Sequence, residues 1–132
     1  MTANVRTADG VYAVDLEAEE VLGLDPGVEV PLPGRGEVAL PLLVASATSG
    51  STVVAVLARR PPLAVSHDAG TTWHEAGGGL PAGRAVAIAP DNPDVVLYAG
   101  RNRLFLSRDG GRFWTGLSIE LPEIEAVAFA TA

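Results

Sequence analysis

The chain has no cysteine and no lysine, and only 5% of its 132 residues are aromatic. Without cysteine, neither a disulfide nor a thiolate metal site can hold the fold together, so burial of apolar side chains must do so. No apolar run approaches the roughly 18 residues that span a bilayer, and the polar first ten residues lack the apolar core of a signal peptide. We therefore expect a cytoplasmic protein that does not enter a membrane.

The composition favours one folded, acidic domain. Hydrophobic residues make up 48% of the chain and are spread along its length, which is typical of a folded protein rather than a disordered one. The formal net charge is −7, and all nine basic residues are arginine. A general nucleic-acid-binding function is not expected, because contacts with phosphates need a basic surface.

Short apolar runs, separated by Gly, Pro, Asp and Asn, predict many short β-strands. The one helix-like window, Leu16–Leu22, is short and has acidic residues on nearly all sides. We expect strands at Val38–Ala47, Thr52–Ala58, Leu63–Ser66, Ala85–Ala89, Val95–Ala99, Leu104–Ser107, Phe113–Leu117 and Ile124–Ala130.

An internal repeat organises these strands. The segment SHDAGTTW, which ends at Trp73, matches SRDGGRFW, which ends at Trp114, and their aspartates, Asp68 and Asp109, are 41 positions apart. The flanking strands match as well. Each unit therefore reads as four strands, A (inner) to D, with the motif between C and D. A third, decayed copy is expected at Val11–Asp15.

The residue types of the motif suit a tight turn. An aspartate can accept hydrogen bonds from the backbone of its own turn, and glycine supplies a positive φ without a Cβ clash. A tryptophan at the start of strand D offers a large apolar surface for the contact between neighbouring sheets. The residues assigned to this structural role are Ser66, Asp68, Gly70, Thr72, Trp73, Ser107, Asp109, Gly111 and Trp114.

The pattern Ser-x-Asp-x-Gly-x-Thr-Trp resembles the Asp-box (BNR repeat) of β-propellers, as in sialidases, xyloglucan-degrading enzymes, sortilin-type receptors and photosystem assembly factors. The resemblance covers residues 40–132 well and residues 1–39 poorly, and the second motif departs from the pattern at Phe113, where threonine is usual. It implies an all-β propeller of four-stranded antiparallel blades. It also implies non-catalytic aspartates, because the boxes of the family lie away from the active site.

Other candidate sites have weaker patterns. His67 and His74 have no third ligand at metal-site spacing, so no metal or other cofactor is expected. Gly77–Gly79 with Arg84 lacks the ending of a phosphate-binding loop. The arginine triad of a sialidase is not recognisable. Glycosidase chemistry needs two facing carboxylates, and the candidates in or near loops are Glu37, Glu120 and Glu123.

Six arginines are expected at one end of the propeller, in the B-to-C and D-to-A connections. We hypothesise that guanidinium groups there bind an anionic or carbohydrate ligand, and the alternative is solvated charge that nearby glutamates partly cancel. These arginines are Arg35, Arg59, Arg60, Arg84, Arg101 and Arg103.

The strand count leaves the chain incomplete as a propeller, which usually has four to eight blades. We predict about three blades: blade 1 at about 4–37, blade 2 at about 38–82 and blade 3 at about 83–122. The inner strand at about 124–131 would be exchanged with a second copy, completing its blade 1 and giving a six-bladed ring of two chains. The alternatives are a piece of a longer protein, and a non-blade structure for Met1–Gly34.

The function indicated is a binding or scaffold propeller that acts as a homodimer and is not an enzyme. The alternative is a glycoside hydrolase, sialidase-like or xyloglucanase-like, with a site formed across the assembled ring. A third alternative is a purely structural remnant of a longer propeller.

Overall fold

The computed structural model describes residues 1–24, 28–36 and 38–130. Within these ranges the regular structure is all β, with no helix that could span a membrane. The strands are β1 (Thr2–Thr7), β2 (Gly10–Asp15), β3 (Glu20–Leu24), β4 (Leu43–Ser49), β5 (Thr52–Leu57), β6 (Leu63–Ser66), β7 (His74–Ala76), β8 (Ala85–Ala89), β9 (Asn92–Ala99), β10 (Leu104–Ser107), β11 (Thr115–Gly116) and β12 (Ile124–Phe129).

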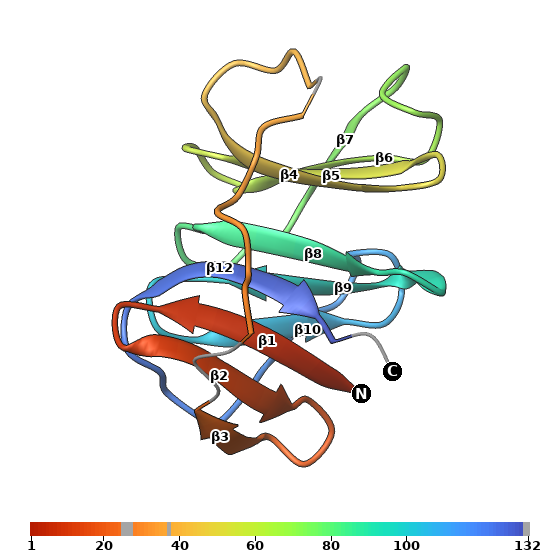
Figure 1. The fold of residues 1–132 in the computed structure, drawn as a ribbon. Helices are drawn as coiled ribbons and strands as arrows, with labels where there is room; N and C mark the ends of the chain where they lie inside the picture. Colours follow the sequence, from red (N-terminus) through yellow and green to blue (C-terminus); the bar gives the residue numbers. More distant parts are fainter. Residues whose placement is uncertain (25–27, 37, 131–132) are drawn as a thin grey trace.

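The strands form three antiparallel sheets of four strands each. In chain order we call them the first sheet (β12-β1-β2-β3), the second sheet (β4-β5-β6-β7) and the third sheet (β8-β9-β10-β11). The third sheet lies between the other two, and its strand β8 contacts both β4 and β12 (Figure 1). The all-β class and the three four-stranded blades expected from the sequence are therefore confirmed.

Most strands lie close to their expected positions. The strand expected at Val38–Ala47 begins only at Leu43, because Leu42 has a positive φ of 61° that interrupts the extended backbone. The strand expected at Phe113–Leu117 is reduced to β11, since the amide of Phe113 is held by the preceding turn. The window Leu16–Leu22 forms a turn and the start of β3 rather than a helix.

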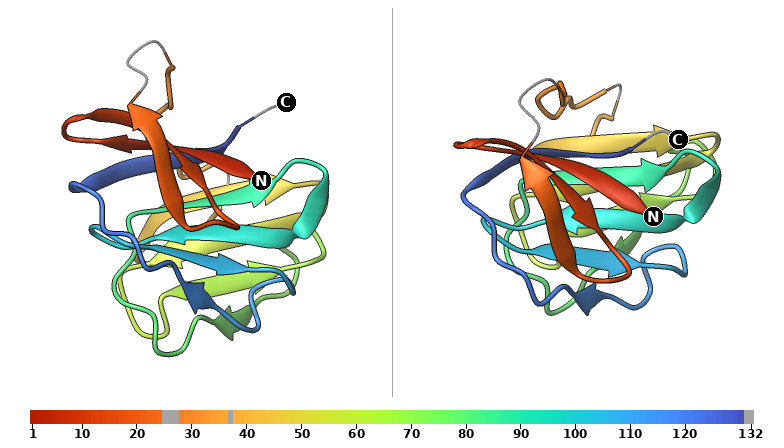
Figure 2. Two further views of the ribbon diagram at one scale, coloured as in Figure 1. Left: turned by 90° about the horizontal axis from the view of Figure 1, so that it is seen from below. Right: turned by 60° about the horizontal axis from the view of Figure 1, so that its bottom comes forward.

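The last strand, β12, pairs with β1 of the same chain, and the pairing aligns Asn4 with Ala128 and Val5 with Val127. Both views in Figure 2 show the two strands side by side. Within a single chain, β12 thus takes the expected place beside β1, and the exchange of this strand with a second copy stays a prediction. The connection from β3 to β4 spans residues 25–42, and a chain of that length reaches roughly 60 Å when extended. This connection is therefore long enough to join the first and second sheets, which lie on opposite faces of the third sheet.

Two apolar layers join the sheets. Between the first and third sheets, Val5, Val14, Leu97, Leu104 and Ile124 belong to one buried cluster. A second cluster lies between the second and third sheets and contains Val54, Val56, Leu63, Val65, Val96 and Tyr98. Because the third sheet is covered on both faces, the first and second sheets each have one face turned away from it.

Candidate functional site

The Ser-x-Asp turns are stabilised by their own side chains. In the first turn the hydroxyl of Ser66 donates to the carboxylate of Asp68 over 2.7 Å, and the amide of Gly70 donates to the Ser66 hydroxyl over 2.8 Å. Both Asp68 oxygens accept hydrogen bonds from Thr72, one from its amide at 2.8 Å and one from its hydroxyl at 2.5 Å. The hydrogen bond from the Thr72 hydroxyl is the largest of the effects that lower the pKa of Asp68 to about 2.

The second turn repeats this network, except that an amide hydrogen bond from Arg112 to Asp109 replaces the hydroxyl bond of Thr72. Ser107 donates to Asp109 over 2.8 Å, and the amide of Gly111 donates to the Ser107 hydroxyl over 2.9 Å. The amide of Phe113 donates to Asp109 over 3.0 Å and is the main cause of the lowered pKa of that carboxyl. Phe113 has no hydroxyl, and its ring is 79% exposed. In both turns the aspartate serves as the acceptor for its own loop.

The two tryptophans lie in different surroundings. Trp114 packs into the layer between the second and third sheets, with its ring centroid 5.9 Å from that of Tyr98, and its Nε1 donates to the carbonyl of Gly111 over 2.9 Å. Trp73 lies on the outer face of the second sheet, where it contacts residues of the segment before β4. Only Trp114 therefore contacts a neighbouring sheet of this chain.

Two of the six predicted arginines line one depression. Arg59 and Arg60, in the β5–β6 connection, line a depression of about 260 Å³ together with Ala82 and Gly83, which lead into β8. Its floor is apolar and includes Leu57 and Leu80. The depression therefore combines a mostly apolar lining with two arginines.

Glu123 joins two more of the predicted arginines, Arg84 and Arg101. Its carboxylate lies 2.9 Å from Arg84 Nη1 and 3.7 Å from Arg101 Nε. Arg59 forms an ion pair of 2.7 Å with Glu75. Arg101 keeps 76% of its side chain exposed, so most of its donors face solvent. Such exposed pairs contribute little to stability, typically below about 1 kcal/mol.

Arg103 and Arg35 lie apart from this group. Arg103 turns toward its own sheet, where Nη2 donates to the carbonyl of Leu117 over 3.0 Å and the guanidinium lies 6.0 Å from the centre of the Phe105 ring. Arg35 lies in the segment before β4, and its backbone carbonyl accepts a hydrogen bond from the hydroxyl of Ser46 in β4. The described residues therefore place Arg59 and Arg60 in the lining of one depression and join Arg84 and Arg101 through Glu123.

The remaining candidates show no constellation that carries chemistry. The rings of His67 and His74 lie 5.5 Å apart, and the described part of the chain contains no group of three metal-ligating side chains. Of the carboxylates considered for glycosidase chemistry, Glu123 is ion-paired, Glu120 is exposed, and Glu37 lies outside the described residues.

Sequence reasoning missed the role of Tyr98. Its side chain is fully buried between the second and third sheets, and its hydroxyl donates to the carbonyl of Pro81 over 2.6 Å. Burial raises the pKa of Tyr98 to about 12. The sequence signal was present, because the second repeat has an aromatic residue where the first has Ala55.

Comparison with known proteins assigns the chain to no family. No family model matches the chain, and no curated protein matches it. Among solved structures, the chain is similar to the crystal structure of the Niastella koreensis GH74 enzyme, with 20% sequence identity and a TM-score of 0.49. The alignment covers 91% of this chain and 18% of the enzyme chain, so this chain spans less than a fifth of that protein's length.

Proposed function

We propose that the chain is a non-catalytic binding or scaffold propeller that takes a carboxylate-bearing sugar at its arginine-rich end. The observation that carries the proposal is the depression of about 260 Å³ lined by Arg59 and Arg60. Arg84 directly follows Gly83 of its lining and shares the carboxylate of Glu123 with Arg101. Its apolar floor suits the face of a sugar ring. Guanidinium groups, which stay ionised and donate in a fork, suit the carboxylate.

The ion pairs favour this use of the arginines. Glu75 and Glu123 hold Arg59 and Arg84 in place at 2.7 and 2.9 Å, so these guanidinium groups have a defined position before a ligand arrives. An arriving carboxylate would exchange with exposed, weakly stabilising pairs rather than break buried ones. Arg101 is held more loosely, and its exposed donors are available to a ligand.

Calorimetric binding tests the proposal. The probe is a uronic-acid oligosaccharide, compared with the same oligosaccharide after reduction of its carboxyl groups. We expect binding of the acidic form only, weakened by salt, and at least about tenfold weaker for Arg60→Ala combined with Arg101→Ala. Arg112→Ala, in the turn between β10 and β11 at the other end, is the matched control and should bind normally. Equal binding by the double variant and the original chain would refute the site.

A glycoside hydrolase has less support. Glu123 forms ion pairs with two arginines. No distance between described residues places it opposite Glu120 across a substrate, and Glu37 lies outside the described residues. A panel of fluorogenic glycosides separates the two functions. Turnover that disappears in Glu123→Gln would replace the binding proposal with an enzymatic one.

A further inference from the structure

The third sheet contributes three aromatic side chains to its contact with the second sheet. The Tyr98 ring lies edge-on to Phe105 and to Trp114, with centroid distances of 6.2 and 5.9 Å. All three pack with residues of the second sheet, including Val65 of β6. The tryptophan of the Ser-x-Asp turn thus belongs to the face that meets the preceding blade.

The repeat identifies the equivalent face of the second sheet. Pairing of Val53 with Ser66 in the second sheet corresponds to pairing of Val96 with Ser107 in the third. With this register, Ala55, Ala64 and Trp73 of the second sheet occupy the positions of Tyr98, Phe105 and Trp114. This face has no neighbouring sheet in the chain, because the third sheet lies on the other side.

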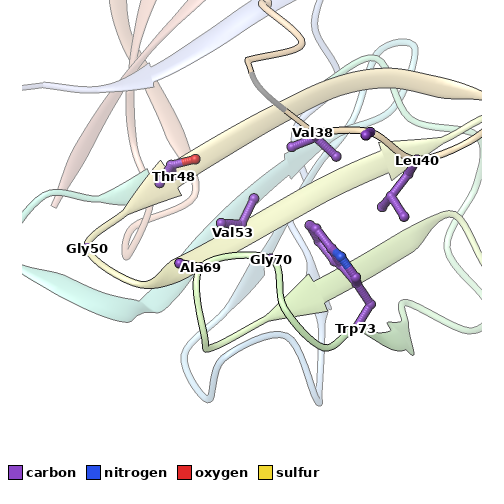
Figure 3. Close-up of a pocket in the computed structure, with 9 residues that line it drawn as sticks. Val38, Leu40, Thr48, Gly50, Val53, Ala69, Gly70 and Trp73 are labelled. Carbon is purple, nitrogen blue, oxygen red and sulfur yellow. The ribbon is translucent and has the colours of Figure 1, made fainter.

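Ala55 and Ala64 are buried beneath the segment before β4, but the part of this face next to the Asp68 turn is hollow. A cavity of about 340 Å³ lies there, and Trp73, Val53, Val38 and Leu40 line it. In Figure 3 the indole of Trp73 and the side chains of Val38 and Leu40 border the same space, with Thr48 at its rim. The segment before β4 therefore covers this sheet only partly.

The outer face of the first sheet is also partly covered. Val11 of β2 and Ala126 of β12 form a small buried cluster there with Val28 and Val30 of the β3–β4 connection. Next to it lies a shallow depression of about 940 Å³, bordered by Arg6 and Glu125. The connection that touches both open faces also exposes two large apolar side chains, Leu32 and Leu42, each 59% accessible.

We propose that a second copy of this chain docks on these faces, with the outer face of its first sheet against the Trp73 face of the second sheet. A second copy is the occupant because the sheets of this chain already pack face to face, the second against the third and the third against the first. A first sheet from a second copy, placed on the outer face of the second sheet, repeats this packing. A two-fold axis makes the same contact twice, so six sheets close into a ring and no outer face remains open. Each copy keeps its own β12, and no strand is exchanged.

The oligomeric state of three chains tests this proposal. Thr48 is exposed at the rim of the hollow, so Thr48→Arg places a long charged side chain in the docking face without disturbing the core. Thr115→Arg, on the exposed outer strand β11, is the matched control. Light scattering should give twice the 13.6 kDa chain mass for the original chain and the control, and a folded monomer for Thr48→Arg. A monomeric original chain at micromolar concentration, or a dimeric Thr48→Arg variant, would overturn the proposal.

Fluorescence provides a second readout at the docking face itself. With Trp114→Phe, Trp73 is the only tryptophan, and its emission should shift to shorter wavelength as the chain concentration rises, because docking removes it from water. Trp73→Phe keeps only the packed Trp114 and should show no such shift. A concentration-independent spectrum in a dimeric Trp114→Phe variant would place the contact elsewhere and refute the proposed face.

Discussion

The hydroxyl of Tyr98 donates a 2.6 Å hydrogen bond to the carbonyl of Pro81, and this bond ties β9 to the connection that leads from β7 into β8. Gly83 lies directly against the same phenol, where any Cβ would overlap the ring and its hydroxyl. The glycine is therefore required by the close approach of its backbone to a buried aromatic side chain.

The Gly83→Ala substitution should destabilise the fold by about 1–3 kcal/mol, because the added methyl group must displace a buried ring. Gly78→Ala is a matched control in the same connection, since a Cβ there meets no atom within 4 Å. It should be neutral or slightly stabilising. Denaturant unfolding of both variants makes the comparison, and equal midpoints would contradict the described packing.

Tyr98 should also make stability depend on alkaline pH. The phenol has its pKa raised by burial from 10.0 to about 12, so the folded state keeps the proton that the unfolded state releases. Its contribution is fully present below pH 10 and is lost as the pH rises toward 12, by about 2–3 kcal/mol in total. Because the chain has no cysteine or lysine, few other groups titrate in this range.

The Tyr98→Phe variant should lose about 0.5–1.5 kcal/mol at neutral pH, since it loses the part-buried hydrogen bond to the Pro81 carbonyl. It should also lose less stability than the original chain between pH 10 and 12. Tyr12→Phe serves as the control for removal of a phenol. An unchanged alkaline dependence in Tyr98→Phe would show that another group is responsible.

The two Ser-x-Asp turns offer a reciprocal test at acid pH. The Thr72 hydroxyl lowers the pKa of Asp68 to about 2, so the stabilisation is present above the ordinary value of 3.8 and is lost as the pH falls through about 2. Thr72→Val should raise the pKa of Asp68 toward its ordinary value. Phe113→Thr, which supplies the missing hydroxyl, should lower the pKa of Asp109 further. Carboxyl chemical shifts followed by NMR measure both, and two unchanged values would contradict the hydrogen-bond assignment.

The same turns differ in backbone strain. Ala69 and Gly110 occupy equivalent positions with positive φ values of 58° and 74°, which an alanine adopts at a cost. Ala69→Gly should therefore be less destabilising than an ordinary alanine-to-glycine change, whereas Gly110→Ala should reduce stability by about 1 kcal/mol. Thermal unfolding of the two variants checks this, and a stabilising Gly110→Ala would rule out the described turn.

Much of the architecture could be predicted because the internal repeat specifies the strands of the second and third sheets. The copies around Asp68 and Asp109 locate eight strands, since local turn chemistry and alternation specify each blade. The decayed copy at Val11–Asp15 also forms a strand, β2, although it lacks the serine, glycine and tryptophan of the motif. Strand pairing there depends on the apolar faces of Val11 and Val14 rather than on the turn.

The partner of β12 could not be predicted in this way. Strand pattern specifies that Ile124–Phe129 lies beside β1, but it does not specify which copy supplies β1. That choice depends on the path of the β3–β4 connection, which has no repeat equivalent in the chain. The arginine cluster was only partly predictable, because loop position places Arg103 at the right end while Leu117 determines the direction of its side chain.

A disulfide between Asn4→Cys and Ala128→Cys tests whether β12 closes the first sheet of its own chain. These positions are Cα partners across β1 and β12, and the natural chain has no competing thiol. After mild oxidation, a denaturing gel without reductant should show a cross-linked single chain, with the two single-cysteine variants as controls. A covalent dimer of twice the 13.6 kDa chain mass, formed only by the double variant, would contradict the account and establish strand exchange.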